Sequence, residues 1–375
     1  MPTDRGTTRG DLLSCYTASI AEYMAAAGIE PELPIGTQAY LAVRRSGTGI
    51  CEFVQFHTPL RGDAPTHSLH LRRRHTTDPA EARARIAAEV ARSGRAIVVG
   101  DTFNVPWQVA HQKSHAPHWF VADGLDDGTA VHVTDRFEFV NEAGEQRPYD
   151  GWVGVDQIAS LATANPDPNP VYVMRDRYAF ADAEDPAAIA TEGYQWYELD
   201  GEPRAAEPDA RSALERLAAT HAAGRGGTPP RTGGDDGWIA GPDAAGLLAE
   251  HIEAGIGEPV TYDNSDDIWV TARNRQLFAE TLTSLGRRWG LPPLAELGAW
   301  TEAEVAKPWA AIPQLMQYNQ RSLARGRTPR PLIVDQLRAA AAAERALYER
   351  LAEILDSLAP DGGRRSGPAS APPAT

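Results

Sequence analysis

Two short segments separated by a polar turn place the strongest constraint on the fold of this chain. His118–Asp123 and Ala130–Asp135 are rich in aromatic and β-branched residues, and Leu125–Gly128 between them contains two aspartates and a glycine. Runs of this composition, bounded by turn residues, are typical of β-strands, and a short turn joins such strands into a hairpin. We therefore predict an antiparallel hairpin in this part of the chain.

The length of the turn decides how the two strands of this hairpin face each other. If Asp126 and Asp127 are the turn residues, His118 lies directly opposite Asp135, with Cβ atoms about 5 Å apart. If the turn is Asp127-Gly128, the two side chains become diagonal neighbours. Either register leaves them on one face of the hairpin, so we expect Asp135 to approach the imidazole ring of His118.

A cysteine stands at the start of the first helical pattern. Apolar residues follow Cys15 at three- and four-residue steps, as Tyr16, Ile20, Tyr23, Met24 and Ala27. Ser14 or Asp11 can cap the start of this helix, and Gly28 can end it in the left-handed conformation. The partial positive charge at a helix N-terminus lowers the pKa of a thiol, so the sequence places Cys15 where a thiolate is favoured.

A cysteine, a histidine and a carboxylate together support nucleophilic catalysis. The histidine holds the thiol proton, and the carboxylate fixes the tautomer of the histidine. We therefore predict that Cys15, His118 and Asp135 form a catalytic triad. A buried structural cysteine and an ordinary core histidine are the alternative for each residue taken alone.

The histidines of the same region allow a second interpretation. His111, His115 and His118 are spaced by four and three residues, which on a helix would create a metal-binding face. Pro117 disfavours a helix through His118, and no cysteine or carboxylate ligand is obvious nearby, so we expect no metal site. His132 alternates away from the face of the predicted triad, and we expect it to be structural.

Composition excludes several classes of protein. The chain has 375 residues, of which 42% are hydrophobic, enough for two domains. Its 36 Lys and Arg against 51 Asp and Glu give a net charge of −15, which argues against nucleic-acid binding.

With two cysteines there is no disulfide framework, and Cys51 should be a core residue. Residues 1–11 are too polar for a signal peptide, and no run of about 18 apolar residues can span a membrane. We expect a soluble, cytoplasmic protein.

The remaining pattern indicates an α+β domain followed by a helical one. We place the first domain at residues 1–180, an irregular connection with one helix and a Gly/Pro-rich linker at 181–237, a helical domain at 238–359 and a disordered tail at 360–375. The first domain should add helices at Glu81–Ser93 and Gly151–Thr163 and strands within 36–56, at Ala96–Gly100 and at Val171–Met174, with Phe103–Trp107 extended. The later helices are expected at Asp209–Ala222, Asp243–Ala254, Ala272–Trp289, Glu302–Leu323 (interrupted by Pro308 and Pro313) and Leu332–Leu358.

These segments resemble a known family. Residues 13–30, Gly100–Trp107 and His118–Asp135 are similar to the N-terminal domain of the butirosin-biosynthesis protein H family. Arg273–Trp289 resembles the helical C-terminal domain of that family, so the resemblance extends over about residues 10–355. It implies a papain-like fold, in which an N-terminal helix packs on an antiparallel sheet.

The resemblance also implies a reaction. The founding member of this family resembles a peptidase but is an acyltransferase, which transfers an aminoacyl group from a carrier-protein thioester, through a cysteine thioester, to an amine of an aminoglycoside. By similarity, Cys15 would be the nucleophile, His118 the base and Asp135 the orienting carboxylate. The implied donor is an acyl carrier protein with its phosphopantetheine arm, or acyl-CoA, with no cofactor bound to the chain itself. The implied acceptor is a small-molecule amine, and intramolecular attack would make the enzyme a cyclase.

One feature of papain-like enzymes is missing from this sequence. They usually carry a glutamine a few residues before the cysteine as an oxyanion donor, and here that stretch is Arg9-Gly10-Asp11-Leu12. The oxyanion would then need backbone amides near Cys15 or a different side chain. Our candidates for oxyanion or substrate contacts are Asn104, Gln108, Trp107 and Tyr16.

Two other functions are compatible with the same residues. A cysteine peptidase or thioesterase would use the same triad with water as the acceptor. A non-catalytic module that binds a peptide or a carrier protein would keep the fold without the chemistry, and the intact triad argues against it.

Overall fold

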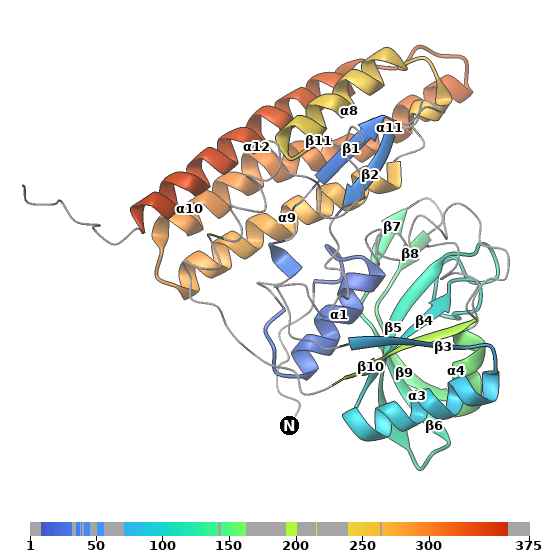
Figure 1. Ribbon diagram of the computed structural model, residues 1–375. Helices are drawn as coiled ribbons and strands as arrows, with labels where there is room; N and C mark the ends of the chain where they lie inside the picture. Colours follow the sequence, from blue (N-terminus) through green and yellow to red (C-terminus); the bar gives the residue numbers. More distant parts are fainter. Residues whose placement is uncertain are drawn as a thin grey trace, which may run out of the picture.

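The protein is an α+β structure with an antiparallel sheet and a helical C-terminal region, seen in a computed structural model (Figure 1). The structure describes residues 9–31, 35–37, 39, 41–45, 51–55, 71–141, 144–162, 193–200, 215, 239–262 and 265–358. The predictions for Val171–Met174, the linker and the tail lie outside these residues, as does Asp209–Ala222 apart from residue 215. Within them, no helix combines the length and the apolar character that crossing a bilayer would require.

A six-stranded sheet forms the centre of the first part of the molecule. The strand order is β3-β10-β4-β5-β6-β9, and all neighbouring strands run antiparallel. The strands are β3 (Leu71–Thr76), β4 (Ala96–Asp101), β5 (Pro117–Asp126), β6 (Ala130–Asp135), β9 (Tyr149–Gly154) and β10 (Tyr194–Leu199). A separate two-stranded sheet consists of β7 (Phe139–Asn141) and β8 (Gly144–Gln146).

Helices cover both faces of the central sheet (Figure 1). Helix α1 (Cys15–Ala26) packs on β5 and β4, in a cluster that includes Trp119 and Val121. Helices α3 (Pro79–Ser93) and α4 (Val155–Leu161) belong to the cluster that includes Phe120 and Ala122. Successive residues of a strand point to opposite faces, so the middle of β5 is buried on both sides.

The boundaries of the first helices follow the signals in the sequence. The side chain of Ser14 caps α1, and Gly28 adopts φ +73° just beyond its end. Asp78 caps α3 by accepting a hydrogen bond from the N–H of Ala80 at 2.8 Å, and Gly94 closes that helix in the left-handed conformation. The cap at Ser14 and the end at Gly28 that the sequence predicts for α1 are confirmed.

The hairpin forms as predicted, but its register differs from the directly opposed one. Asp126 pairs with Ala130, so the turn has three residues, and Asp127 and Gly128 both take positive φ. A β-bulge then shifts the register by one residue between Ala122 and Gly124. Beyond it, Val121 pairs with Thr134, which makes His118 and Asp135 diagonal neighbours, as in the second register considered.

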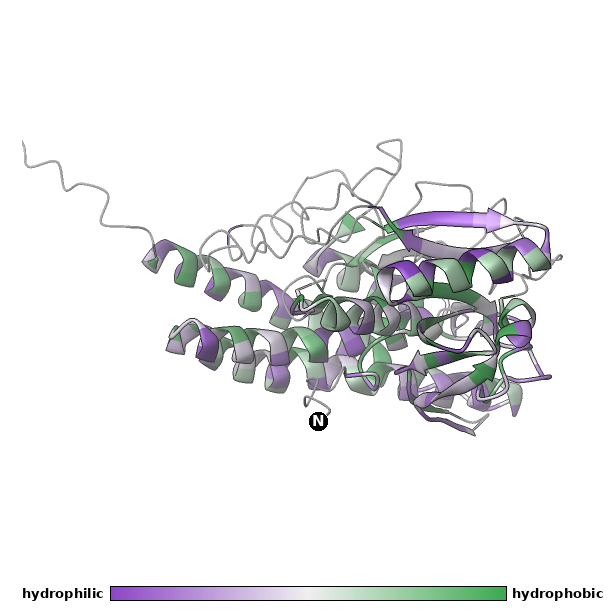
Figure 2. Ribbon diagram, turned by 90° about the horizontal axis from the view of Figure 1, so that it is seen from below, coloured by the Kyte–Doolittle hydropathy of each residue, from purple (hydrophilic) through white to green (hydrophobic). Residues whose placement is uncertain are grey.

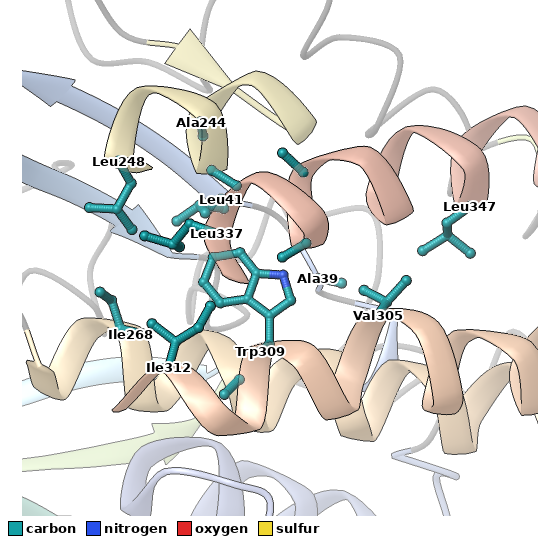
Figure 3. Packing of buried hydrophobic residues seen from close by; sticks show 14 of the residues in the cluster. Ala39, Leu41, Ala244, Leu248, Ile268, Val305, Trp309, Ile312, Leu337 and Leu347 are labelled. Carbon is teal, nitrogen blue, oxygen red and sulfur yellow. The ribbon is translucent and has the colours of Figure 1, made fainter. Parts of the chain in front are cut away.

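The C-terminal half is an assembly of helices with its own apolar core. The helices are α8 (Pro242–Ala254), α9 (Ser265–Arg288), α10 (Pro292–Thr301), α11 (Lys307–Ala324) and α12 (Leu332–Ser357), with a 3₁₀ turn at Pro259–Tyr262 and a π-helical segment at Glu302–Ala306. Trp309 is fully buried at the centre, with Ile312 and Leu337 against it (Figure 3). Hydrophobic and hydrophilic residues both occur along these helices (Figure 2), as expected of helices with one buried side.

The path of the chain differs from a simple division into consecutive domains. A three-stranded sheet of β11 (Ile239–Ala240), β1 (Leu41–Arg45) and β2 (Cys51–Gln55) lies against the helices. Leu41 is part of the helical core (Figure 3). Conversely β10, from the region expected to be an irregular connection, inserts between β3 and β4. Each half of the molecule therefore contains a strand from outside its predicted range.

Several local predictions are wrong for reasons visible in the packing. Gly151–Gly154 belongs to β9, and the helix predicted there is only α4. Phe103–Trp107 forms turns and not an extended segment. Helix α11 runs through Pro313, which is buried, because packing of this helix face outweighs the backbone hydrogen bond that a proline cannot donate. Helix α10 was not predicted.

Candidate active site

Cys15 is the first residue of helix α1, and the helix start is firmly fixed. Ser14 Oγ accepts a hydrogen bond from the N–H of Thr17 at 3.2 Å, and the hydroxyl of Thr17 accepts one from the N–H of Ser14 at 2.9 Å. This reciprocal capping box sets the direction in which the helix leaves the preceding segment. Cys15 is not part of a disulfide, and only 4% of the residue is exposed. Cys15 is thus a buried thiol at a helix N-terminus.

His118 connects this thiol to a buried carboxylate. Its Nε2 lies 2.7 Å from Asp135 Oδ2, both side chains are 1% exposed, and the ring also shares a hydrogen bond with Cys15. Burial lowers the pKa of His118, but the charges of Asp135 and Cys15 and their hydrogen bonds outweigh it and raise the pKa to about 10. At neutral pH the site therefore favours the imidazolium form of His118, and a neighbouring positive charge of this kind favours the thiolate form of a cysteine.

Asp135 is held by donors from three separate parts of the chain. Besides His118, its Oδ2 accepts hydrogen bonds from Trp107 Nε1 at 2.8 Å and from Gln108 Nε2 at 3.1 Å. Its Oδ1 accepts the backbone N–H of Phe137 at 3.0 Å. Both oxygens are used, so the carboxylate is fixed in position.

The structure gives each candidate for the oxyanion contact a location. Gln108 and Trp107 reach the site, but they bind the carboxylate on the Nε2 side of the His118 ring. Trp107 is further held by stacking on Tyr149, with ring centroids 4.1 Å apart. Tyr16 is buried and packs edge-on against Trp119. Asn104 lies in the turn after β4, where its N–H donates to the carbonyl of Asp101.

The stretch before Cys15 is pressed against the strand that carries Asp135. A Cβ on Gly10 would lie 1.6 Å from the carbonyl oxygen of Arg136, so only glycine fits there. The N–H of Glu138 donates to the carbonyl of Gly10 at 3.3 Å. Where papain-like enzymes carry the glutamine, this chain thus has a tight backbone contact. That contact joins the segment before Cys15 to the segment that follows Asp135.

Helix α9 of the C-terminal half completes this contact. Arg273 donates from Nη1 to the carbonyl of Leu13 and from Nη2 to the carbonyl of Glu138, both at 3.0 Å. Its guanidinium lies 3.7 Å from the ring centroid of Trp269, which packs against the cluster that contains Cys15. Burial lowers the pKa of Arg273 to about 10. The sequence did not predict these hydrogen bonds of Arg273. Its local signal for them is the four-residue spacing that places Trp269 and Arg273 on one face of the helix.

The remaining histidines of this region have other partners. His115 Nδ1 lies 2.7 Å from Asp101 Oδ2, and the segment from His111 to His118 is not helical, so the histidine face considered in the sequence does not form. His132 lies between Asp123 and Asp150. Among the described residues, no group of three or more His, Cys, Asp or Glu side chains is arranged to hold a metal ion.

Comparison with models of known protein families finds no match to this chain, and no curated protein matches it significantly. The assignment of a function therefore depends on the geometry described above.

Proposed function

We propose that this protein is a papain-like cysteine acyltransferase. The observation that carries the proposal is the continuous, buried chain from the Cys15 thiol through His118 to Asp135. A nucleophile at the start of the first helix and a histidine on a strand of an antiparallel sheet are the arrangement expected of that class. The resemblance of the sequence to the butirosin-biosynthesis protein H family suggests a role in the biosynthesis of an antibiotic or another specialised metabolite.

The first step would load an acyl group onto the enzyme. The Cys15 thiolate attacks the carbonyl carbon of a donor thioester, and the carbon–sulfur bond of the donor breaks. The departing donor thiolate takes the proton from the His118 imidazolium, which leaves an acyl-Cys15 thioester and a neutral imidazole. Backbone amides at the start of α1 are the donors best placed for the oxyanion, because the N–H groups in the first turn of a helix point along its axis beyond its N-terminus.

The second step would transfer the acyl group. An amine acceptor attacks the acyl-Cys15 carbonyl and gives its proton to His118, and Cys15 leaves as the thiolate. The thiolate–imidazolium pair is then restored. Asp135 would hold the ring with Nε2 toward itself, which leaves Nδ1 for the thiol.

Burial of the thiol supports a particular kind of donor. A group that reaches a residue of 4% exposure must be slender, as is a thioester on a phosphopantetheine arm. We therefore propose an acyl carrier protein or acyl-CoA as the donor and a small-molecule amine as the acceptor, with no cofactor bound to the chain. A mechanism that needs a reduced cysteine suits a reducing compartment, so we place the reaction in the cytoplasm.

Intact-protein mass spectrometry after incubation with acyl-carrier and acyl-CoA thioesters tests the proposal. We expect an acyl adduct on the wild-type protein that is absent from Cys15→Ala, with turnover lowered by about 10⁴-fold or more. Cys51→Ala is the matched control, and it should still form the adduct. An amine acceptor should discharge the adduct to an amide product.

Two outcomes would contradict this function. Turnover unchanged in Cys15→Ala would remove the nucleophile from the mechanism. Release of the acyl group to water at the same rate with and without amines would identify the protein as a hydrolase that uses the same triad.

A further inference from the structure

The bulge in the hairpin decides whether Asp135 can reach His118. Between the turn and the bulge, Gly124 pairs with His132. On the other side of the bulge the register is shifted by one residue, and Val121 pairs with Thr134. Continued by one residue, the second register sets Asp135 opposite Phe120, on the same face of β5 as His118. Without the bulge, Asp135 would lie opposite Val121 and point to the other face.

The extra residue of the bulge is Asp123, and its carboxylate is bound to the opposite strand twice. Asp123 Oδ1 lies 2.7 Å from His132 Nδ1, and its Oδ2 accepts a hydrogen bond from the hydroxyl of Thr134 at 3.0 Å. These two partners lie on either side of Val133 and therefore span the shift in register. Gly124 leaves room for this contact, since a Cβ there would lie 3.0 Å from the Cβ of His132.

A series of polar contacts continues from His132 to helix α1, which begins at Cys15. His132 Nε2 lies 3.1 Å from Asp150 Oδ1, and the other oxygen of Asp150 lies 3.1 Å from Arg136 Nη2. Arg136 Nε then donates to Glu22 Oε2 of α1 at 3.4 Å. Arg136 directly follows Asp135, so this series joins the bulge, the end of β6 and helix α1.

We propose that Asp123 and His132 are positioning residues of the active site, which hold the bulge that brings Asp135 to His118. The inference rests on the proposed function for its consequence in catalysis, but its structural content concerns only the triad geometry. His132 suits this task because its two ring nitrogens face two carboxylates, Asp123 on β5 and Asp150 on β9. The ring of Trp152 packs edge-on against it with centroids 5.0 Å apart.

The rate of alkylation of Cys15 by iodoacetamide, followed by peptide mass spectrometry across pH 5–10, tests this proposal without any acyl donor. In the wild-type protein we expect fast alkylation at neutral pH that depends on His118. A displacement of about 1 Å between reacting groups can cost about a hundredfold in rate. We therefore expect His132→Phe and Asp123→Asn to lower the alkylation rate at pH 7 by about ten- to a hundredfold and to shift its pH profile upward.

Matched variants separate positioning from a general loss of structure. Thr134→Val removes the hydroxyl that donates to Asp123 and should lower the alkylation rate. Thr134→Ser keeps this hydroxyl and should alkylate at the wild-type rate. His75→Phe removes a histidine from β3, at the other edge of the same sheet, and should leave the profile unchanged. Thr134→Val and Thr134→Ser carry the test even if His132→Phe does not fold.

The outcomes distinguish this inference from the proposed function. If His118→Ala does not change the alkylation profile, the triad itself is absent and the proposed function fails. If that profile depends on His118 but folded His132→Phe, Asp123→Asn and Thr134→Val all match the wild-type protein, the positioning role is wrong and the triad stands.

Discussion

Asp135 in the sheet and Glu344 in the helical half are both 1% exposed, and each lies beside a buried cationic side chain. Glu344 Oε1 accepts hydrogen bonds from Arg275 Nε and from Trp309 Nε1, both at 2.8 Å. Among the described residues, no hydrogen-bond partner is found for Glu344 Oε2 or for Arg275 Nη1 and Nη2. Asp135 by contrast uses both oxygens.

The difference shows two uses of a buried charge. The many donors on Asp135 fix its position, and a fixed carboxylate is what an orienting residue in catalysis requires. The pair of Arg275 and Glu344 is incompletely satisfied, so its net contribution to stability is small even though loss of one partner would be costly. We expect the pair of His118 and Asp135 to control the reaction and the pair of Arg275 and Glu344 to control only folding.

Replacement of Asp135 should give the largest effect. Asp135→Asn keeps the size of the side chain but removes the charge that stabilises the imidazolium and its correct tautomer. We expect the rate of acyl transfer to fall by about 10²- to 10⁴-fold. Single-turnover kinetics with an acyl-carrier thioester measures the rate, and circular dichroism confirms the fold. A folded variant with a wild-type rate would show that Asp135 does not orient His118.

Replacement of Glu344 should instead affect stability. Glu344→Gln leaves the guanidinium of Arg275 buried without a counter-charge, which costs about 3–5 kcal/mol in the free energy of unfolding. Denaturant titration measures this loss, and the rate per folded molecule should stay at the wild-type value. The double variant Arg275→Met/Glu344→Leu is the control, and it should recover most of the stability. A lower rate per folded molecule in Glu344→Gln would connect the helical core to catalysis.

The last effect expected is a dependence of stability on pH at the pair of His118 and Asp135. The pKa of His118 is raised in the folded protein from 6.5 to about 10. Its favourable contribution is therefore complete below about pH 6.5 and is lost as the pH rises toward 10. The difference in unfolding free energy between the wild-type protein and His118→Gln should shrink across this window. A difference that stays constant from pH 6 to 10 would mean that His118 is neutral in the folded protein.

Local signals in the sequence determined much of the fold and pointed to the residues that meet at the candidate site. The Ser14 cap and Gly28 delimit α1, the Asp78 cap begins α3, and the strands of the hairpin follow from their composition. These features depend on residues a few positions apart, which is the range over which capping and turn preferences act. For the same reason the sequence could place Cys15 at a helix start.

Contacts between distant segments decided the remainder. The bulge at Asp123 depends on partners across the hairpin, and it chose between the two registers that turn chemistry allowed. Arg273 reaches the carbonyls of Leu13 and Glu138 only because α9 packs beside α1. The insertion of β10 between β3 and β4 likewise depends on long-range strand pairing. Sequence periodicity shows which side of an element is apolar, but only the packed structure shows what that side meets, because burial is shared between segments far apart in the chain.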